Sequence, residues 1–304
     1  MPKHLITGKE LSAGEIKSLL KLSGELKKKR KEGQCHPALK GKHLAMLFEK
    51  PSLRTRFSFM VAMQELGGTV VESVSDTRKK EEPEDLTKVL SGYCDGIMIR
   101  TNKDDDLTRM EKVSAIPIIN ALSDDHHPCQ ILADLLTLKE VFGKLEGLKL
   151  TYIGDGNNIL HSLLLMVPQV GVHFHYCCPA SRGPKEDILA TAKLKADLSK
   201  GSITAHSSPQ MAVKDAHAVY TDVWASMGFE NSTKEELFAG FQVNEQLMAL
   251  ALPEAIFMHC MPMVRGKEVS DTLPDSPASV IFQQSENRLH VQKALLVTLM
   301  GEKA

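Results

Sequence analysis

Residues 48–59 read FEKPSLRTRFSF, and the interpretation of the surrounding chain starts from this segment. The apolar run at residues 44–48 predicts a buried strand, and the apolar positions after the segment recur at helical spacing. A strand, a short loop and a helix in this order leave free backbone N–H groups at the start of the helix, where anions bind. Ser52 and Thr55 add hydroxyl donors, and Arg54 adds a planar guanidinium that matches a phosphate. The segment therefore predicts a phosphate-binding site without the glycines of a P-loop.

A simpler interpretation of the same segment remains open. Ser52 would then only cap the helix, and Arg54 and Arg56 would be exposed arginines. Arg56 in particular can serve as a structural ion-pair partner rather than as a ligand-binding residue. The segment alone does not decide between a cap and a phosphate site.

Length and composition indicate an ordinary globular protein. The chain has 304 residues, of which 42% are hydrophobic and 25% charged, with a formal net charge of -1. This length favours two domains, and the charge balance argues against a disordered or nucleic-acid-coating protein. No run of about 18 apolar residues occurs, so no membrane span is expected. The first residues, MPKHLITGKELS, lack the apolar core of a signal peptide.

The cysteines point to a reducing compartment. None of the six forms a CxxC pair, and a chain of this size does not need disulfides for stability. We therefore expect a cytoplasmic protein that binds neither nucleic acid nor membranes. Cys94 and Cys129 are interpreted as small buried apolar residues.

Strands and helices are expected to alternate along the whole chain. The first series of strands is expected at residues 44–48, 69–73, 96–100 and 116–120, and the second at 150–154, 172–177, 203–206, 218–222, 255–259 and 279–283. Helices are expected between them, including residues 8–31, 106–113, 128–142 and 286–300. This alternation predicts an α/β protein of two domains, each a parallel sheet flanked by helices. The expected domains are residues 1–140, joined by the C-terminal helix at 286–304, and residues 141–285.

Polar residues gather after most of the expected strands, where ligands of such sheets bind. These clusters are Arg54 and Thr55; Arg100 and Thr101; His127 and Gln130; Asp155, Asn157 and Asn158; Asp222, Ser226 and Met227; His259, Cys260 and Pro262; and Arg288 after the expected strand at 279–283. Their repeated position at strand ends is a stronger signal than any one cluster.

Several of these clusters have simpler readings. GDGNN at residues 154–158 lacks the third glycine of a dinucleotide fingerprint and suits a tight turn with a helix cap. His126, His127 and Cys129 have no second ligand pair at zinc spacing, so no metal site is expected. His259 and Cys260 are adjacent, and adjacent strand residues point to opposite faces. We therefore expect their side chains not to meet as a catalytic dyad.

Taken together, the motifs resemble the aspartate/ornithine carbamoyltransferase family, in its ornithine-type pattern. The matching segments are SLRTR at residues 52–56, HPCQ at 127–130, GDGNN at 154–158, DVWASMG at 222–228, HCMP at 259–262 and QSENRLHVQKALL at 284–296. They cover nearly the whole chain in the right order, and the joint match is very specific.

The chain departs from the family pattern at two places. Leu53 stands where the family usually has threonine, which matters little if that position binds phosphate through its backbone N–H. Residues 76–83 read DTRKKEEP, where the family usually has a glutamine followed by glycines. Arg78 or Lys79 can supply positive charge there, and the sequence does not identify a replacement for the glutamine.

The resemblance implies transfer of a carbamoyl group from carbamoyl phosphate to L-ornithine, giving L-citrulline and phosphate, in a cleft between the two domains. The catalytic residues it implies are Arg54, Arg100, His127 and Cys260. The carbamoyl phosphate site it implies comprises Ser52, Leu53, Arg54, Thr55, Arg100, His127, Gln130, Cys260, Met261 and Arg288. The ornithine site it implies comprises Asn158, Asp222, Ser226 and Met227.

The resemblance also implies that no metal or organic cofactor is required and that the protein is a homotrimer or a multiple of one. It favours arginine biosynthesis over degradation as the role. Other functions remain open: carbamoyl transfer to an N-acylated ornithine, putrescine or aspartate; a Rossmann-type dehydrogenase; or a related protein that binds ligand without catalysis.

Overall fold

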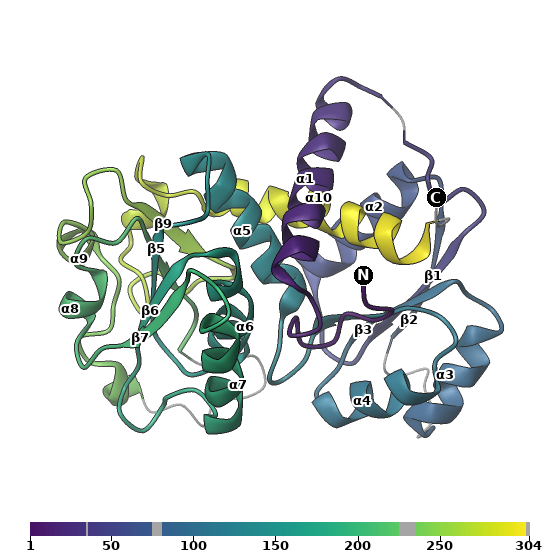
Figure 1. The fold of residues 1–304 in the computed structure, drawn as a ribbon, viewed down its shortest axis with the longest axis horizontal. Helices are drawn as coiled ribbons and strands as arrows, with labels where there is room; N and C mark the ends of the chain where they lie inside the picture. The colour runs from purple at the N-terminus through teal and green to yellow at the C-terminus, as the bar shows by residue number, and fades with distance from the viewer. Residues whose placement is uncertain (35, 75–80, 225–234, 302–304) are drawn as a thin grey trace. The chain divides into compact units, whose positions relative to one another are not determined.

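The computed structural model describes residues 1–34, 36–74, 81–224 and 235–301. Contacts divide the chain into two compact units: the first unit is Met1–Leu136 with Glu286–Ala304, and the second unit is Thr137–Ser285. The chain passes between the units within two long helices, α5 and α10, drawn in teal and yellow in Figure 1. Their bounds are Pro128–Phe142 for α5 and Ile281–Met300 for α10.

The first unit is built on a parallel sheet of four strands in the order β2-β1-β3-β4. The strands are β1 (His43–Phe48), β2 (Thr69–Val74), β3 (Gly96–Arg100) and β4 (Ile118–Leu122). The connecting helices are α2 (Leu53–Glu65), α3 (Pro83–Ser91) and α4 (Asp104–Val113), and α1 (Ala13–Lys31) precedes the sheet. In Figure 1, α3 and α4 lie together on one side of the sheet and α2 on the other. Helices on both faces explain why five of the six residues of β1 are buried.

The second unit repeats this architecture with five parallel strands in the order β7-β6-β5-β8-β9. The strands are β5 (Lys149–Ile153), β6 (His173–Cys177), β7 (Ser202–Ala205), β8 (Ala218–Thr221) and β9 (Ile256–His259). The helices are α6 (Asn158–Met166), α7 (Glu186–Ala196), α8 (Pro209–Val213) and α9 (Glu245–Met248), with single 3-10 turns at Pro168–Val170, Glu235–Phe238 and Leu273–Asp275. The expected class of fold is thus confirmed.

The order of strands creates a switch point in each sheet. β1 and β3 are neighbours, but the chain leaves β1 towards β2 on one side and leaves β3 towards β4 on the other. β5 and β8 have the same relation in the second sheet. Ligands of doubly wound sheets bind at the carboxyl ends of such strand pairs, because the connections diverge there and leave a crevice. The ends of β1 and β3, and those of β5 and β8, are therefore the places to look for sites.

Polar caps fix where the key helices begin. Ser12 and Glu15 form a reciprocal capping box at α1, so this helix starts at Ala13. The start at residue 8 that was expected from the sequence is wrong. The Ser52 hydroxyl accepts a hydrogen bond from the backbone N–H of Thr55 at the start of α2. Asn157 caps α6 by accepting from two backbone N–H groups. Two of these caps stand directly beyond switch-point strands.

One predicted strand is wrong. Residues 279–283 were expected to form a strand because Val280, Ile281 and Phe282 suit one, but α10 begins at Ile281. Only a short stretch pairs with β9: Phe257 donates to the carbonyl of Ala278 and accepts from the N–H of Val280. The expected strand at 116–120 also lies two residues later, at Ile118–Leu122.

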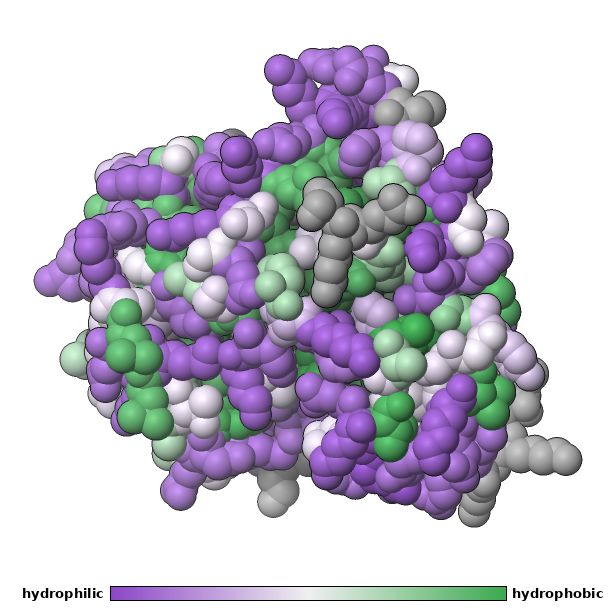
Figure 2. Space-filling view, turned by 45° about the vertical axis from the view of Figure 1, so that its right-hand side comes forward, coloured by the Kyte–Doolittle hydropathy of each residue, from purple (hydrophilic) through white to green (hydrophobic). Residues whose placement is uncertain are grey.

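Surface and core divide in the usual way. Hydrophilic side chains make up most of the face drawn in Figure 2, with hydrophobic ones interspersed among them. In the described part of the chain, no helix is both long and apolar enough to cross a membrane. The buried cores are formed by the strands and the inner faces of their helices.

Candidate active site

The first half of the candidate site lies at the switch point of the first unit. Ser52 stands between the end of β1 and the first turn of α2, and its hydroxyl oxygen accepts from Nη1 of Arg100 at 3.1 Å. Arg100 is the last residue of β3 and is buried. The cap that opens α2 is therefore held by a guanidinium from the neighbouring strand. A helix start with this charge beside it suits an anion.

A second arginine reaches the same helix from the end of the chain. Arg288 of α10 donates from Nη2 to the Thr55 hydroxyl at 2.8 Å and from Nη1 to Oε1 of Gln130 at 2.5 Å. Gln130, in the first turn of α5, donates in turn to Asp134 at 2.8 Å. Thr55, Gln130 and Arg288 are all buried. The expected strand-end position of Arg288 is wrong, yet α10 brings it to the expected partners.

His127 is buried near the positive charges of Arg100 and Arg288, and both conditions affect its pKa. Burial lowers the pKa of His127 well below its ordinary value of 6.5, and the positive charges of Arg288 and Arg100 lower it further. The imidazole is therefore neutral at neutral pH. A neutral imidazole still has one N–H, so it can donate a hydrogen bond to a carbonyl oxygen without giving up a proton.

The other predicted residues of the 52–56 segment differ in environment. Leu53 is the first residue of α2 and has an exposed side chain, which leaves its backbone N–H as the group suited to an anion. Arg54 follows it in the first turn and is partly buried. Arg56 pairs with Glu72 of β2, and its guanidinium lies 5.5 Å from the ring centre of Phe48. Arg56 therefore has the structural role that the simpler interpretation gave it.

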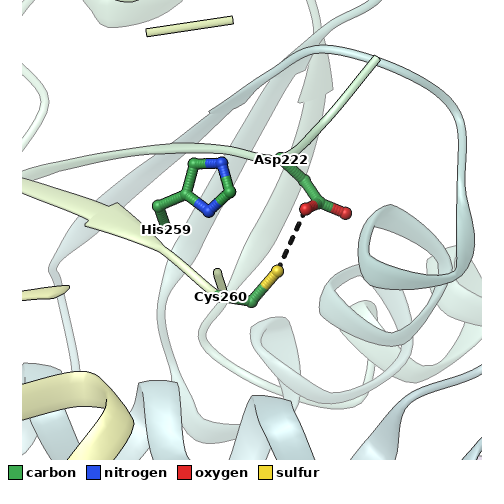
Figure 3. Close-up of side chains that lie close together, drawn as sticks. All are labelled: Asp222, His259 and Cys260. Carbon is green, nitrogen blue, oxygen red and sulfur yellow. Dashed lines mark hydrogen bonds between the residues drawn. The ribbon is translucent and has the colours of Figure 1, made fainter. Parts of the chain in front are cut away.

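The second half of the candidate site lies at the switch point of the second unit. Asp222 directly follows β8, and Cys260 directly follows β9. The Cys260 thiol donates to Oδ1 of Asp222 at 3.1 Å, and the two side chains point toward each other in Figure 3. The other carboxylate oxygen, Oδ2, accepts from Nδ2 of Asn157 at 2.7 Å. Asp222 thus stands at a strand end with each oxygen fixed, where a carboxylate can pair with an ammonium group.

The GDGNN turn at residues 154–158 holds the Asp222 carboxylate in place through Asn157. Asn157 has its amide oxygen turned to the N–H groups of Ile159 and Leu160, so its NH2 group must face Asp222. Tyr152 donates to the carbonyl of Asp155 at 2.9 Å. Gly156 passes so close to the carbonyl oxygen of Gly183 that a Cβ on it would lie 2.2 Å away. The glycine therefore serves close backbone packing rather than dinucleotide binding, as the sequence indicated.

Asp155 is held by an arginine at the back of the same turn. Arg182 donates to both carboxylate oxygens, at 2.8 and 2.5 Å. Burial nevertheless raises the pKa of Asp155 above its ordinary value, and the nearby charge of Asp222 also raises it, while the bond from Arg182 acts in the opposite direction. Asp155 is thus a structural group, because its carboxylate is occupied by Arg182.

His259 and Cys260 lie closer together than strand alternation suggested, although the prediction that they do not form a catalytic dyad is not contradicted. One ligand atom each of Asp222, His259 and Cys260 lie within 4.8 Å of one another, because Cys260 stands beyond the end of β9 and does not follow strand alternation. Both ring nitrogens of His259 have other partners, however: Nδ1 the N–H of Met261 and Nε2 the carboxylate of Glu268. The only bond drawn among the three in Figure 3 joins Cys260 and Asp222. His259 is thus occupied and is poorly suited to act as a base or a metal ligand.

The remaining predicted residues are placed as follows. Asn158 is the first residue of α6, one position after the cap, and Met261 follows Cys260. Ser226 and Met227 lie outside the described residues, as do Arg78 and Lys79 of the loop that departs from the family pattern. Cys129 is buried and donates to the Asn120 carbonyl, and burial raises the pKa of its thiol to about 12. Cys129 is therefore a core residue, as expected.

The sequence analysis missed two contacts of the second half. Asn157 was named at a strand end and within a turn with a helix cap, but its bond to Asp222 was not predicted. Glu268 carried no signal, because it stands in a loop without a motif and meets His259 only in the folded chain.

Comparisons with known proteins agree with these two halves. The profile described as "Aspartate/ornithine carbamoyltransferase, carbamoyl-P binding domain" matches residues 3–140. The profile described as "Aspartate/ornithine carbamoyltransferase, Asp/Orn binding domain" matches residues 146–299. The chain therefore belongs to the aspartate/ornithine carbamoyltransferase family.

Within that family, the chain is similar to proteins named ornithine carbamoyltransferase. The chain is 48% identical over 303 residues to the ornithine carbamoyltransferase of Anoxybacillus flavithermus, covering 98% of this chain and 96% of the relative. The structure of ornithine carbamoyltransferase from Pyrococcus furiosus matches with a TM-score of 0.95 and 43% identity, covering 99% of this chain and 98% of that one. The structure of anabolic ornithine carbamoyltransferase from Campylobacter jejuni matches with a TM-score of 0.92 and 37% identity, covering 98% and 99%.

Proposed function

We propose that this protein transfers the carbamoyl group of carbamoyl phosphate to the side-chain amine of L-ornithine, giving L-citrulline and phosphate. The observation that carries the proposal is the set of contacts around the start of α2, where Arg100 bonds Ser52 and Arg288 bonds Thr55. Such an arrangement suits a phosphate group. The full-length similarity to proteins named ornithine carbamoyltransferase supports the choice of acceptor.

The residues of the first unit act on the donor in this proposal. Ser52, Arg54, Thr55 and the N–H groups of the first turn of α2 hold the phosphate and stabilise the charge that it gains as it leaves. Thr55, Arg100 and neutral His127 donate to the carbamoyl oxygen as it becomes an oxyanion. Arg288 adds positive charge.

The carbamoyl amide is oriented by a separate set of groups. Gln130, together with the carbonyls near Cys260 and Met261, accepts from the NH2 of the carbamoyl group. The buried state and the bond from Arg288 support a fixed position for Gln130. Orientation of this kind keeps the carbonyl carbon in line for attack.

The residues of the second unit act on the acceptor. Asp222 pairs with the α-ammonium, Asn158 and the backbone of Ser226 and Met227 bind the amino-acid end, and Cys260 lies beside the side-chain amine. That amine attacks the carbonyl carbon as the neutral form, the bond from this carbon to the phosphate oxygen breaks, and the amine loses a proton, which passes to the leaving phosphate or to water. The ordinary pKa of this amine is about 10, and removal from water lowers it.

The proposal extends to the role and setting of the protein. We place it in arginine biosynthesis, in the cytoplasm. The similarity to an anabolic enzyme supports this direction. A reducing compartment is supported by the described cysteines that form no disulfide: Cys94, Cys129, Cys177, Cys178 and Cys260. The reaction as written needs no metal or organic cofactor, because the mixed anhydride already activates the carbonyl.

A homotrimer, or a multiple of one, is proposed as the assembly. Three apolar side chains on one face of α2 are exposed in the single chain: Leu53 at 68%, Phe57 at 61% and Met60 at 43%. Exposed apolar side chains grouped on one helix face favour contact with another chain. Light scattering coupled to size-exclusion chromatography measures the mass, and a monomeric mass would contradict this part of the proposal.

A competition assay tests the function. The purified protein is given carbamoyl phosphate with ornithine, N-acetylornithine, putrescine or aspartate, and the carbamoylated product of each is measured. We expect citrulline from ornithine to exceed every other product by kcat/KM. A higher kcat/KM for another acceptor would assign the protein to that acceptor instead, and no product from any of them would contradict catalysis.

A further inference from the structure

A buried histidine–glutamate pair lies directly behind Cys260. His259 is the last residue of β9 and Glu268 stands in the loop that follows, and both side chains are almost completely removed from solvent. Nε2 of His259 lies 3.2 Å from Oε1 of Glu268. Neither residue has a role in the proposed reaction, so the pair calls for another explanation.

The bonds of the ring determine its tautomer. Nδ1 of His259 lies 2.8 Å from the backbone nitrogen of Met261, and a backbone N–H can only donate. Nδ1 must therefore accept and carry no proton. The ring proton then lies on Nε2 and is donated to the Glu268 carboxylate, so the pair is a neutral histidine bonded to a carboxylate rather than an ion pair.

The same carboxylate holds the far end of the loop. Oε1 of Glu268 also accepts from the N–H of Val264 at 2.6 Å. The backbone of Glu268 is fixed in turn, because its carbonyl accepts from the N–H of Val243 at 2.9 Å. His259 and Glu268 together thus bind the loop at Met261 and at Val264.

The loop needs such support at Met261. This residue has a φ of 57°, in the left-handed region that is unfavourable for a residue other than glycine. Conformations of this kind persist where the surroundings determine them, and the acceptor on His259 is such a constraint. Met261 directly follows Cys260, whose thiol bonds Asp222 at 3.1 Å.

We infer that His259 and Glu268 are positioning residues for the acceptor half of the site: the carboxylate selects the tautomer whose Nδ1 holds the Met261 N–H, and this bond sets the Cys260 thiol against Asp222. The inference rests on the proposed function, because the thiol and the carboxylate are the groups assigned to ornithine. It adds that ornithine use depends on one nitrogen of a residue that touches no substrate.

Two substitutions of His259 test whether the residue positions the Met261 N–H or only fills space in the core. His259→Asn puts an amide oxygen near the position of Nδ1, so it can still accept from Met261. His259→Gln carries its amide out toward Glu268 and leaves no acceptor for that N–H. We expect kcat/KM for ornithine to stay within about 10-fold of wild type in the first variant and to fall at least about 100-fold in the second. The KM for carbamoyl phosphate should change much less than the kcat/KM for ornithine in both variants, because most of the groups proposed to bind it lie in the first unit.

A second pair of variants tests the carboxylate. Glu268→Gln keeps an acceptor oxygen for His259 and Val264, whereas Glu268→Met has a similar volume and keeps none. We expect the glutamine variant to retain ornithine kinetics and the methionine variant to raise the KM for ornithine about 10-fold or more, with melting temperatures measured for each. Equal ornithine kinetics within both pairs, or a loss that affects the two substrates alike and follows the melting temperature, would overturn the inference.

The tautomer itself can be observed without any assay. Long-range nitrogen–proton correlation spectra of histidine-labelled protein, assigned with the His259 variants, should show Nδ1 of His259 unprotonated and Nε2 protonated at neutral pH. A proton on Nδ1 would overturn the inference even if the enzyme is active. A wild-type protein that makes no citrulline, but shows the expected tautomer, would instead contradict only the proposed function and the link to ornithine.

Discussion

Asn157 donates from Nδ2 to Oδ2 of Asp222 at 2.7 Å, although the two residues are 65 positions apart. The amide cannot turn over, because its oxygen caps α6. Its donor is therefore committed to the one carboxylate that is proposed to bind the α-ammonium of ornithine. The Asn157 amide therefore joins the cap of α6 to the carboxylate of the proposed ornithine site through hydrogen bonds.

Asn157→Asp should remove that donor and keep the cap. A second carboxylate would then face Asp222, and like charges this close repel or force one group to take up a proton. We expect kcat/KM for ornithine to fall about 100-fold, with steady-state kinetics as the measurement. Asn244→Asp is the matched control, since Asn244 caps α9 in the same way by accepting from the N–H of Leu247. Equal losses in the two variants would contradict the role given to Asn157.

Arg54→Lys should severely reduce turnover. Lysine keeps the positive charge but loses the planar pair of donors that matches a phosphate, and losing one such transition-state donor costs about 10²- to 10³-fold. Arg56→Lys is the control, because Arg56 pairs with Glu72 and a lysine can still do so. We expect at most a several-fold loss there. Near wild-type kcat in Arg54→Lys would remove the phosphate site from the proposal.

Asp222→Asn should change the choice of acceptor. Asp222 is proposed to pair with a charge that ornithine carries on its amino-acid end, and a site built for polar pairing rejects ligands that leave its groups unpaired by up to ~10⁴-fold. The variant should therefore lose far more kcat/KM with ornithine than with putrescine, while the KM for carbamoyl phosphate stays the same. An unchanged ratio of ornithine to putrescine would mean that another group recognises the acceptor.

Stability should fall as the pH falls from about 6.5, and His4 should contribute to this. Burial lowers the pKa of His4 from 6.5 to about 4, with the charge of Lys3 adding to the effect, and its Nδ1 accepts from the N–H of Ile118 at 3.1 Å. Between these two pH values the unfolded chain binds a proton that the folded chain does not, so the free energy of unfolding decreases with decreasing pH.

His4→Asn supplies an amide oxygen that does not titrate. Its melting temperature should therefore fall less between pH 7 and pH 5 than that of the wild type, while other histidines contribute equally to both proteins. Differential scanning calorimetry across this range gives the comparison. Parallel curves would show that His4 does not take part in the loss of stability.

The sequence predicted most of the fold because its pattern is local. Short apolar runs bounded by polar turns gave the strands of both sheets to within about two residues. The exception at residues 279–283 arose because a β-branched run resembles a strand, whereas in the folded chain the preceding residues already pair with β9 and α10 starts at Ile281. Tertiary packing thus overrode local propensity.

The candidate site was predicted where motifs stand at strand ends, and missed where partners meet only by folding. Cys260 and Asp222 were named from sequence, and the structure brings them together. Glu268 could not be named, because nothing in its neighbours announces a buried carboxylate. The separation of His259 and Cys260 was misjudged because strand alternation was applied to a residue that lies beyond the strand.

The contact between Thr55 and Arg288 spans 233 positions of the chain. A ribosome therefore releases the whole of the second unit, Thr137–Ser285, before it releases the helix that completes the first. Domains usually fold in the order in which they are made. Here the first unit is completed after the second, and a nascent chain arrested anywhere before α10 lacks one of the arginines of the proposed anion site. A newly made molecule therefore gains its full set of proposed phosphate-binding charges only after the second unit has been made.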